Sequence, residues 1–293
     1  MAISQITFYP NGLQYYGFNK STYPQMNGQN YACSGGQTTG RLYDLTDNRN
    51  SALLTVGTNG EATEFNIKHV NTSEISGANF IVLDNHNLKT ANAKIIVDDV
   101  YTVLPIVPIS SKSGTLGSAL ANDTIKAILD AFIPSQNGIT LAKLTATDIK
   151  ATKGFEVNFR MVGSTFSANI TLGELVLGKS FTPSVNPEYG EAFEFGYAND
   201  GLSLYTNKSG RRFVSHFHSE RRFWKLDFNC VTESELAEFR RIFQITRGYP
   251  LYVSFDSDSN TPTVYRVRIV NSYNAIPIAA GLYEVVVEME EEL

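Results

Sequence analysis

Two of the four histidines, His216 and His218, stand two residues apart in this chain of 293 residues. In a strand, that spacing places both imidazoles on one face, and Glu220 continues the same row. Imidazole and carboxylate groups are zinc ligands, but a zinc site needs a third or fourth ligand in fixed geometry, and none is identifiable in the sequence. Three nearby arginines would also repel a cation. We therefore expect His216 and His218 to be exposed or interfacial.

A second set of candidate ligands is the segment Asp256–Asn260, which carries side-chain oxygens at alternate positions. Calcium loops have such a spacing, but this segment lacks the downstream glycine and bidentate glutamate of the helical-loop type. Between two strands, Asp, Ser and Asn are ordinary turn formers. The sequence favours a turn and leaves open whether an ion binds there.

No arrangement typical of an enzyme is recognisable. The nucleophile elbow, the HExxH zinc motif, the P-loop and the dinucleotide fingerprint are all missing from the sequence. The glycine-rich run Ser34–Gly40 precedes no helix, so it predicts a loop and not a phosphate cradle. None of the acidic residues has a sequence context that would raise its pKa. We therefore expect a protein that is not an enzyme and that has no catalytic residue, cofactor or metal.

A third histidine, His86, stands in the run Asp84-Asn85-His86-Asn87, directly after the apolar residues 80–83. Asn and Asp tolerate left-handed backbone angles and bond their own main chain. A histidine ring donates at one nitrogen and accepts at the other. Because no catalytic partner for His86 is apparent, we interpret Asp84, Asn85, His86 and Asn87 as a structural turn that reverses the chain.

The composition limits the classes of partner. A net charge of −5 disfavours nucleic-acid binding. No apolar run approaches the roughly 20 residues that cross a bilayer, so no membrane insertion is expected, and no signal peptide is visible at the N-terminus. The two cysteines, Cys33 and Cys230, lie far apart and predict free thiols in a protein made in a reducing cytosol.

The secondary structure that positions these residues is predicted to consist mainly of strands. Up to about residue 110, short apolar segments are broken by Gly, Asn and Ser at intervals typical of a β-sandwich or jelly roll. The segment 124–135 is different, because its apolar residues at helical spacing predict a helix that stops before Pro134. Alternating residues then predict strands at 155–161 and 167–181.

The second half predicts an α+β domain with an antiparallel sheet and one capped helix. The segment 182–190 contains two prolines and a glycine, which marks a domain boundary. Thr232 to Glu235 form a capping box, and an apolar stripe follows it. Strands are expected on either side of this helix at 192–197, 213–217, 223–228, 251–255, 263–270 and 283–290.

The sequence also resembles a family of tail proteins from long-tailed bacteriophages. The segment NFIVLDNHNLKTANAKIIV (79–97) is similar to a strand, turn and strand of that family, and GRLYDLTDNRNSALLTV (40–56) fits an earlier segment. Further on, the match is residue for residue at Gly173, Leu175, Leu177, Gly178, Pro183, Asn186 and Gly190. This resemblance implies a galactose-binding-like, or discoidin-like, jelly roll over residues 1–183, with an insertion at about 110–150.

The C-terminal part is similar to the core of distal-tail proteins. It shares a strand at 222–228, a capped helix with Glu235, the run RGYPLYVSFDSD (247–258) and an acidic terminal strand. The resemblance implies a distal-tail-like α+β domain over residues 184–293. It also implies a structural virion protein, a subunit of the tail tip or baseplate that assembles as a homo-oligomeric ring at the distal end of the tail tube.

The resemblance further implies where the protein is found and what it contacts. It would be synthesised in the cytoplasm of a host bacterium and located in the virion, against tail-tube, hub and fibre proteins. A ring needs one patch on a subunit to meet a different patch on the next, and arginines and glutamates are segregated along the chain. The candidate subunit-interface residues are Arg211, Arg212, Arg221, Arg222, Glu290, Glu291 and Glu292.

An alternative hypothesis is an adhesin module of the tail that binds a glycan on the host surface. Jelly rolls of this type hold sugars through loops at one end, and the tyrosines at 15, 16, 23 and 31 would stack on sugar rings. The same tyrosines would equally serve a core or a subunit contact. Binding to a glycan array separates the two hypotheses.

Overall fold

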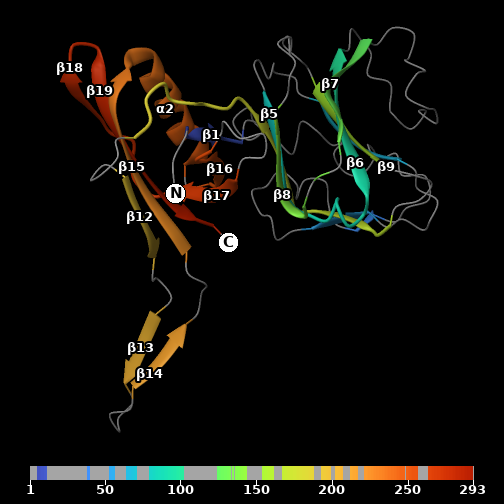
Figure 1. Ribbon diagram of the computed structural model, residues 1–293, viewed down its shortest axis with the longest axis horizontal. Helices are drawn as coiled ribbons and strands as arrows, with labels where there is room; N and C mark the ends of the chain where they lie inside the picture. Colours follow the sequence, from blue (N-terminus) through green and yellow to red (C-terminus); the bar gives the residue numbers. More distant parts are fainter. Residues whose placement is uncertain are drawn as a thin grey trace. The chain divides into compact units, whose positions relative to one another are not determined.

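The chain folds into two compact units (Figure 1). Unit 1 holds the residues up to Pro10 together with Phe181–Leu293, and unit 2 holds Asn11–Ser180. Unit 2 is therefore an insertion in unit 1. The computed structural model describes residues 5–11, 38–39, 53–56, 64–70, 79–101, 124–132, 134, 136–143, 154–161, 167–187, 193–198, 202–206, 212–216, 221–247, 249–256 and 263–292.

Unit 1 is built on a seven-stranded antiparallel sheet. Its strands are β1 (Thr7–Tyr9), β12 (Phe193–Ala198), β15 (Arg221–Thr232), β16 (Leu251–Ser254), β17 (Val264–Ile269), β18 (Ala275–Ala279) and β19 (Leu282–Glu291). The order is β1-β16-β17-β19-β15-β12, and β18 also pairs with β19. β16 to β19 are close together in sequence, but β1 comes from the other end of the chain and still pairs with β16.

Alternation along the two long strands decides which face of this sheet is buried. In β15, Trp224, Leu226 and Phe228 are buried, and the residues between them are only partly so. In β19, Val285 and Val287 are buried in the same alternating way. Since successive side chains of a strand point to opposite faces, one face of the sheet carries the core and the other does not.

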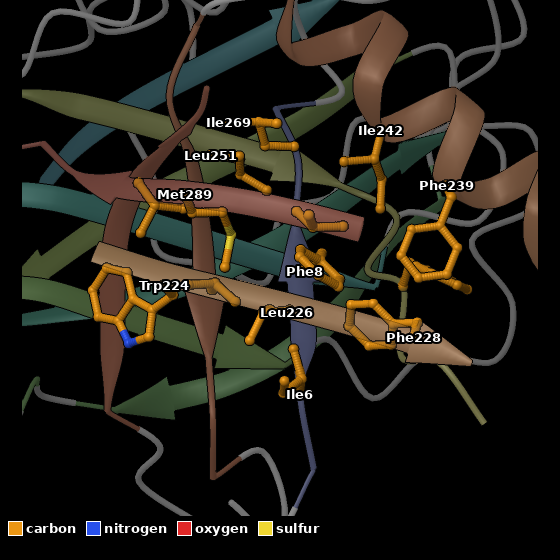
Figure 2. Packing of buried hydrophobic residues seen from close by; sticks show 14 of the residues in the cluster. Ile6, Phe8, Trp224, Leu226, Phe228, Phe239, Ile242, Leu251, Ile269 and Met289 are labelled. Carbon is orange, nitrogen blue, oxygen red and sulfur yellow. The ribbon is translucent and has the colours of Figure 1, made fainter. Parts of the chain in front are cut away.

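Helix α2 (Glu233–Thr246) begins where the sequence predicts it. The Thr232 side chain accepts from the backbone N–H of Glu235, and the Glu235 carboxylate accepts from the backbone N–H of Thr232 at 3.0 Å. These two bonds satisfy orphan donors of the first turn. Phe239 and Ile242 are buried and turn toward β15 and Phe8 (Figure 2), so α2 covers the core face of the sheet.

Aromatic rings bring distant parts of unit 1 together. The Phe8 ring on β1 lies 6.2 Å from the Phe228 ring and 6.4 Å from the Phe181 ring, between centroids. Phe239 of α2 lies 5.0 Å from both Phe181 and Phe228. β1 and β15 are not neighbours in the strand order, yet Phe8 meets Phe228. The sheet therefore curls around this cluster, which forms the core shown in Figure 2.

A separate two-stranded ribbon lies between β12 and β15 in the chain. It consists of β13 (Leu202–Thr206) and β14 (Arg212–His216), paired from Leu202 opposite His216 to Thr206 opposite Arg212. It is drawn below β12 and β15 in Figure 1.

Unit 2 contains three antiparallel sheets among its described residues. Their orders are β10-β3-β2, β11-β5-β8 and β4-β9-β6-β7. The strands are β2 (Thr38–Thr39), β3 (Leu54–Val56), β4 (Glu64–Val70), β5 (Phe80–His86), β6 (Ala93–Tyr101), β7 (Thr124–Phe132), β8 (Gly138–Lys143), β9 (Gly154–Met161), β10 (Ile170–Leu172) and β11 (Glu174–Gly178). The prediction of a mainly β protein is confirmed, and α2 is the one helix in the described part of the chain.

The predicted helix at 124–135 is wrong, because Thr124–Phe132 form strand β7. In the sequence, Ile125, Ala127 and Leu129 also alternate with Thr124, Lys126 and Asp130, and Ile128 is the one exception, so most of the segment fits both periods. Pairing with β6, about thirty residues earlier, selects the strand. β7 and β8 both fall within the expected insertion at 110–150, and they pair with β6 and β5 as members of two sheets.

The start of the chain also differs from the sequence prediction, which places it in the N-terminal domain. β1 pairs with β16, from Thr7 opposite Ser254 to Tyr9 opposite Tyr252. Phe8 and Phe181 exchange two backbone hydrogen bonds of 2.9 Å. The physical reason is that Ile6 and Phe8, which alternate with Thr7, are buried in the core cluster of unit 1. No helix of the described residues is long and apolar enough to cross a membrane.

Candidate functional site

The residues 84–87 lie at the end of strand β5. Asp84, Asn85 and His86 still belong to the strand, and the turn follows over residues 88–92. Pairing with β8 shifts in register between Leu83 and His86, and Asn85 has a left-handed φ of 50°. The predicted turn is therefore a β-bulge at the end of a strand, with the reversal just after it.

His86 is held by two hydrogen bonds. Its Nδ1 accepts from the backbone N–H of Leu88 at 3.3 Å, so the proton of the neutral ring is on Nε2. Nε2 then donates to the Thr140 hydroxyl, 2.8 Å away. The residue is only 3% exposed, and this burial lowers the pKa of His86 to about 4. A neutral ring with both nitrogens engaged is suited to fixing the corner and not to acid–base chemistry at pH 7.

Asn87 joins this corner to strand β10. Its side-chain N–H₂ donates to the carbonyl of Asn169 at 2.6 Å, and its side-chain oxygen accepts from the backbone N–H of Thr171 at 2.8 Å. A second asparagine, Asn137, does the same on the other side, because its oxygen accepts from the backbone N–H of Thr90 at 3.2 Å. The corner is therefore tied to two other segments of unit 2 by amide side chains.

Two buried carboxyl groups lie beside the corner. Asp84 of β5 and Glu174 of β11 are directly opposite in the antiparallel register, and both are buried. One oxygen of Asp84 accepts from the backbone N–H of Asn85 at 2.6 Å. Within the described part of the chain, no group of three or more His, Cys, Asp or Glu side chains is placed to hold a metal ion.

One arginine and one glutamate of the predicted subunit interface meet inside one chain. Arg222, at the start of β15, contacts Glu291, at the end of β19, with Nε 3.7 Å from the carboxylate oxygen. The Arg222 guanidinium also lies 5.0 Å from the centroid of the Tyr265 ring. β15 and β19 are neighbouring antiparallel strands, so the start of one lies beside the end of the other.

Glu292 has partners within the chain as well. Its Oε1 lies 2.8 Å from Arg268 and 3.7 Å from the buried Arg266, both on β17. Glu290 stands opposite Phe223 and Arg268 in the register, and Arg221 opposite Ala198. Arg222, Glu291 and Glu292 therefore have partners within the chain, and a role of these charged residues between subunits stays a prediction.

Other candidates fall partly or wholly outside the described residues. Arg212 and His216 are at the two ends of β14, and only their backbone is described. Asp256 accepts from the backbone N–H of Thr263 at 2.9 Å, as a turn-forming residue does. The residues that lie outside the described part are Arg211, His218, Glu220, Cys33, the four tyrosines at 15, 16, 23 and 31, and positions 257–260.

Sequence reasoning missed the partners that hold His86. Thr140 is 54 positions away and Leu88 contributes only a backbone group, so no local pattern points to either. It also missed Glu174, whose opposite position depends on the pairing of β11 with β5. Comparison with known proteins adds no assignment, because no protein-family model matches the sequence and no curated protein matches it.

Proposed function

We propose that this chain is a structural subunit of a bacteriophage tail, part of the tail tip or baseplate, and that it assembles in a ring at the distal end of the tail tube. One observation carries the proposal. The elements in which the sequence resembles distal-tail proteins, now β15, α2, β16 and β19, belong to one sheet and the helix that covers it. Segments spread over 70 residues of sequence thus form a single framework.

The residues between 173 and 190 that match the family of tail proteins support the same proposal. Gly173, Leu175 and Leu177 lie at β11, where the chain is about to leave unit 2, and Asn186 lies just beyond Phe181 in unit 1. The Asn186 side chain accepts from the backbone N–H of Ile6 at 3.3 Å. The shared positions therefore fall where unit 2 is joined to unit 1.

The proposal includes a discoidin-like jelly roll for unit 2. What supports it is that all the strand pairs of this unit are antiparallel among its described residues, and that β5 pairs with both β11 and β8. A crystal structure of the full chain would test it, since a jelly roll requires two packed sheets connected by Greek-key crossings.

The tail proposal is tested in virions. We expect an antibody against the chain to label purified phage particles at the tip of the tail in electron microscopy, and peptides of the chain to be present in those particles. Label on the capsid, or a chain found only in the lysate and not in particles, would contradict the proposal. An enzymatic role has no support at His86, whose two ring nitrogens both have partners.

A further inference from the structure

The outer face of the unit 1 sheet can be assigned from the register. Val285 and Val287 of β19 belong to the core, so Glu284, Val286 and Glu288 point to the opposite face. Their partners in the neighbouring strands share that face. Asp227 stands opposite Val286, and Lys225 opposite Glu288.

An apolar patch lies on this outer face and at its edge. Ile276 stands opposite Glu284, and both Ile276 and Ile278 are 46% exposed. Val270, directly after β17, is 45% exposed. We define the apolar patch as Val270, Ile276, Ile278 and Val286. Large exposed apolar side chains that gather in this way on a stable protein mark an interaction surface.

The hairpin that presents the patch is fixed in place and carries no protective charge. Ala275, at its base, and Tyr283, near its tip, pack against the core. Gly281 takes a φ of 71° at its tip, a conformation that suits glycine. The residues 275–282 include no charged side chain, whereas edge strands are usually protected by one. Pro277 has no N–H to give to an added strand, which disfavours strand addition at this edge and favours a contact made by side chains.

A surface of opposite character lies on helix α2. Its exposed positions are those turned away from the buried Phe239 and Ile242, and they continue past the helix end to Tyr249, which is 52% exposed. We define the basic face as Ala237, Arg240, Gln244, Arg247 and Tyr249. It offers two guanidinium groups and an aromatic ring, which are residue types enriched at protein interfaces.

The charges of the two surfaces are complementary. Around the apolar patch, four carboxylates (Asp227, Glu284, Glu288 and Glu290) stand against two cationic groups (Lys225 and Arg268), so the rim carries a net negative charge. The basic face carries Arg240 and Arg247. A carboxylate rim around an apolar centre fits a partner that brings arginines around an aromatic ring.

The two surfaces point in opposite directions. α2 packs against the core face of the sheet, and the apolar patch belongs to the other face. One copy therefore cannot bring its own two surfaces together. We propose that copies of this chain associate head to tail, with the apolar patch of one copy against the basic face of the next. Such a contact generates a ring if the rotation closes, and the inference thereby rests on the proposed function and names its contact surfaces.

Two double variants test the contact. A patch variant carries Ile276→Lys and Ile278→Lys, which place positive charge opposite Arg240 and Arg247. A helix variant carries Arg240→Glu and Arg247→Glu. All four positions are exposed, so both variants should fold and show the wild-type circular dichroism spectrum. In sedimentation velocity we expect wild type to form a closed oligomer, and each variant alone to remain monomeric at the same concentration.

Mixing the two variants is the sharper measurement. The patch variant retains an intact basic face, and the helix variant retains an intact apolar patch. A head-to-tail contact therefore predicts that an equimolar mixture forms a heterodimer with one intact contact, under conditions where each variant alone is monomeric. A patch-to-patch contact predicts instead that the helix variant, whose apolar patch is intact, associates by itself and that the patch variant does not join it. That result, or a mixture that stays monomeric, would overturn the proposal.

Matched controls come from unit 2. Leu53→Lys changes an apolar side chain that is 41% exposed, and Lys89→Glu reverses an exposed charge. Both controls should form the wild-type oligomer. A wild-type protein that is monomeric at all concentrations, or an oligomer that persists in both double variants, would show that this contact is wrong. The tail proposal is tested separately, because it fails only if the chain is missing from the tail tip of virions.

Discussion

The His86 ring is buried, and this burial sets its titration. Its pKa is about 4 in the folded protein, because the ring is buried, and close to 6.5 in an unfolded chain. Below pH 6.5 the unfolded chain therefore binds a proton that the folded protein does not take up until about pH 4. Stability is lost over this window as the pH falls, by up to about 3 kcal/mol.

We predict that NMR will find the His86 ring neutral and protonated at Nε2 at pH 7, with a titration midpoint near pH 4. In urea unfolding, His86→Gln should lower the free energy of unfolding at pH 7 but show a weaker decline between pH 6.5 and 4 than wild type. A midpoint near 6.5, or an unchanged pH dependence in the variant, would contradict the burial argument.

At Cys230 the backbone conformation limits which residues are tolerated. It lies in the bulge of β15, between Phe228 and Val231, and takes a left-handed φ of 63° with an exposed side chain. A β-branched residue is disfavoured there, whereas Asn adopts this conformation readily. We predict that Cys230→Val lowers the free energy of unfolding by about 1–2 kcal/mol, and that Cys230→Asn leaves it unchanged or higher. Equal effects of the two substitutions on thermal unfolding would refute this explanation.

For single residues, the sequence indicates which conformations a residue type tolerates, but it does not indicate which distant residue is its hydrogen-bond partner. A left-handed residue in the run 84–87 is foreseeable, because Asn tolerates such angles, and Asn85 has one. Cys230 is not foreseeable, since cysteine has no preference for that conformation. The hydroxyl that accepts from His86 belongs to Thr140 on another strand, and nothing local to either residue indicates the pairing.

Among the elements, helix α2 depends most on one carboxylate. Partial burial alone would raise the pKa of Glu235, but hydrogen bonds from Ser184 and Thr232 outweigh it and lower the pKa to about 2. The bond from the backbone N–H of Ser184, at 2.7 Å, ties the returning segment after Phe181 to the helix. The stabilisation is therefore present above pH 4.5 and is lost as the pH falls toward 2.

We predict that Glu235→Gln lowers the free energy of unfolding at pH 7, and that the difference from wild type disappears as the pH approaches 2. Glu233→Gln is the matched control, because Glu233 is also an acid of the first helical turn but is not the capping-box residue. It should change stability only slightly. Thr232→Ala removes the other half of the capping box and should cost about 1 kcal/mol. A difference for Glu235→Gln that is constant with pH would exclude the carboxylate as its source.

Elements defined by local signals are the ones that the sequence predicts. The capping box and apolar stripe of α2 are contained in fifteen consecutive residues, and the alternation of β15 and β19 is equally local. Strand β7 is the counterexample, because its residues fit a helical and a strand period alike. Its pairing with β6 makes it a strand, and no local sequence pattern indicates that pairing.

At the scale of the whole molecule, the pairing between the two segments of unit 1 determines how the domains are arranged along the chain. Sequence order suggests two domains in succession, but β1 is separated from β16 by more than 240 positions and still pairs with it. No composition or periodicity marks a strand of three residues as belonging to a distant sheet. The insertion of unit 2 between Pro10 and Phe181 is therefore a result that only the fold provides.

This arrangement predicts which part of the chain can fold without unit 2. A fragment of residues 184–293 lacks β1 and Phe181, so it exposes the side of the core that Phe8 fills between Phe228 and Phe239. We expect it to be largely unfolded. A chain in which a short Gly/Ser linker joins Pro10 to Phe181 keeps both segments, and the linker has little distance to cover because Phe8 and Phe181 are hydrogen-bonded neighbours.

We predict that this linked chain unfolds cooperatively in urea with well-dispersed amide signals in NMR. Introducing Phe8→Ala into it should cost about 3–5 kcal/mol, the usual loss for a buried phenylalanine, whereas Tyr249→Ala, at an exposed position, should have little effect. If the 184–293 fragment proved as stable as the linked chain, β1 would be a peripheral addition. Its loss would then leave the core of unit 1 intact, contrary to the packing of Phe8 against three rings.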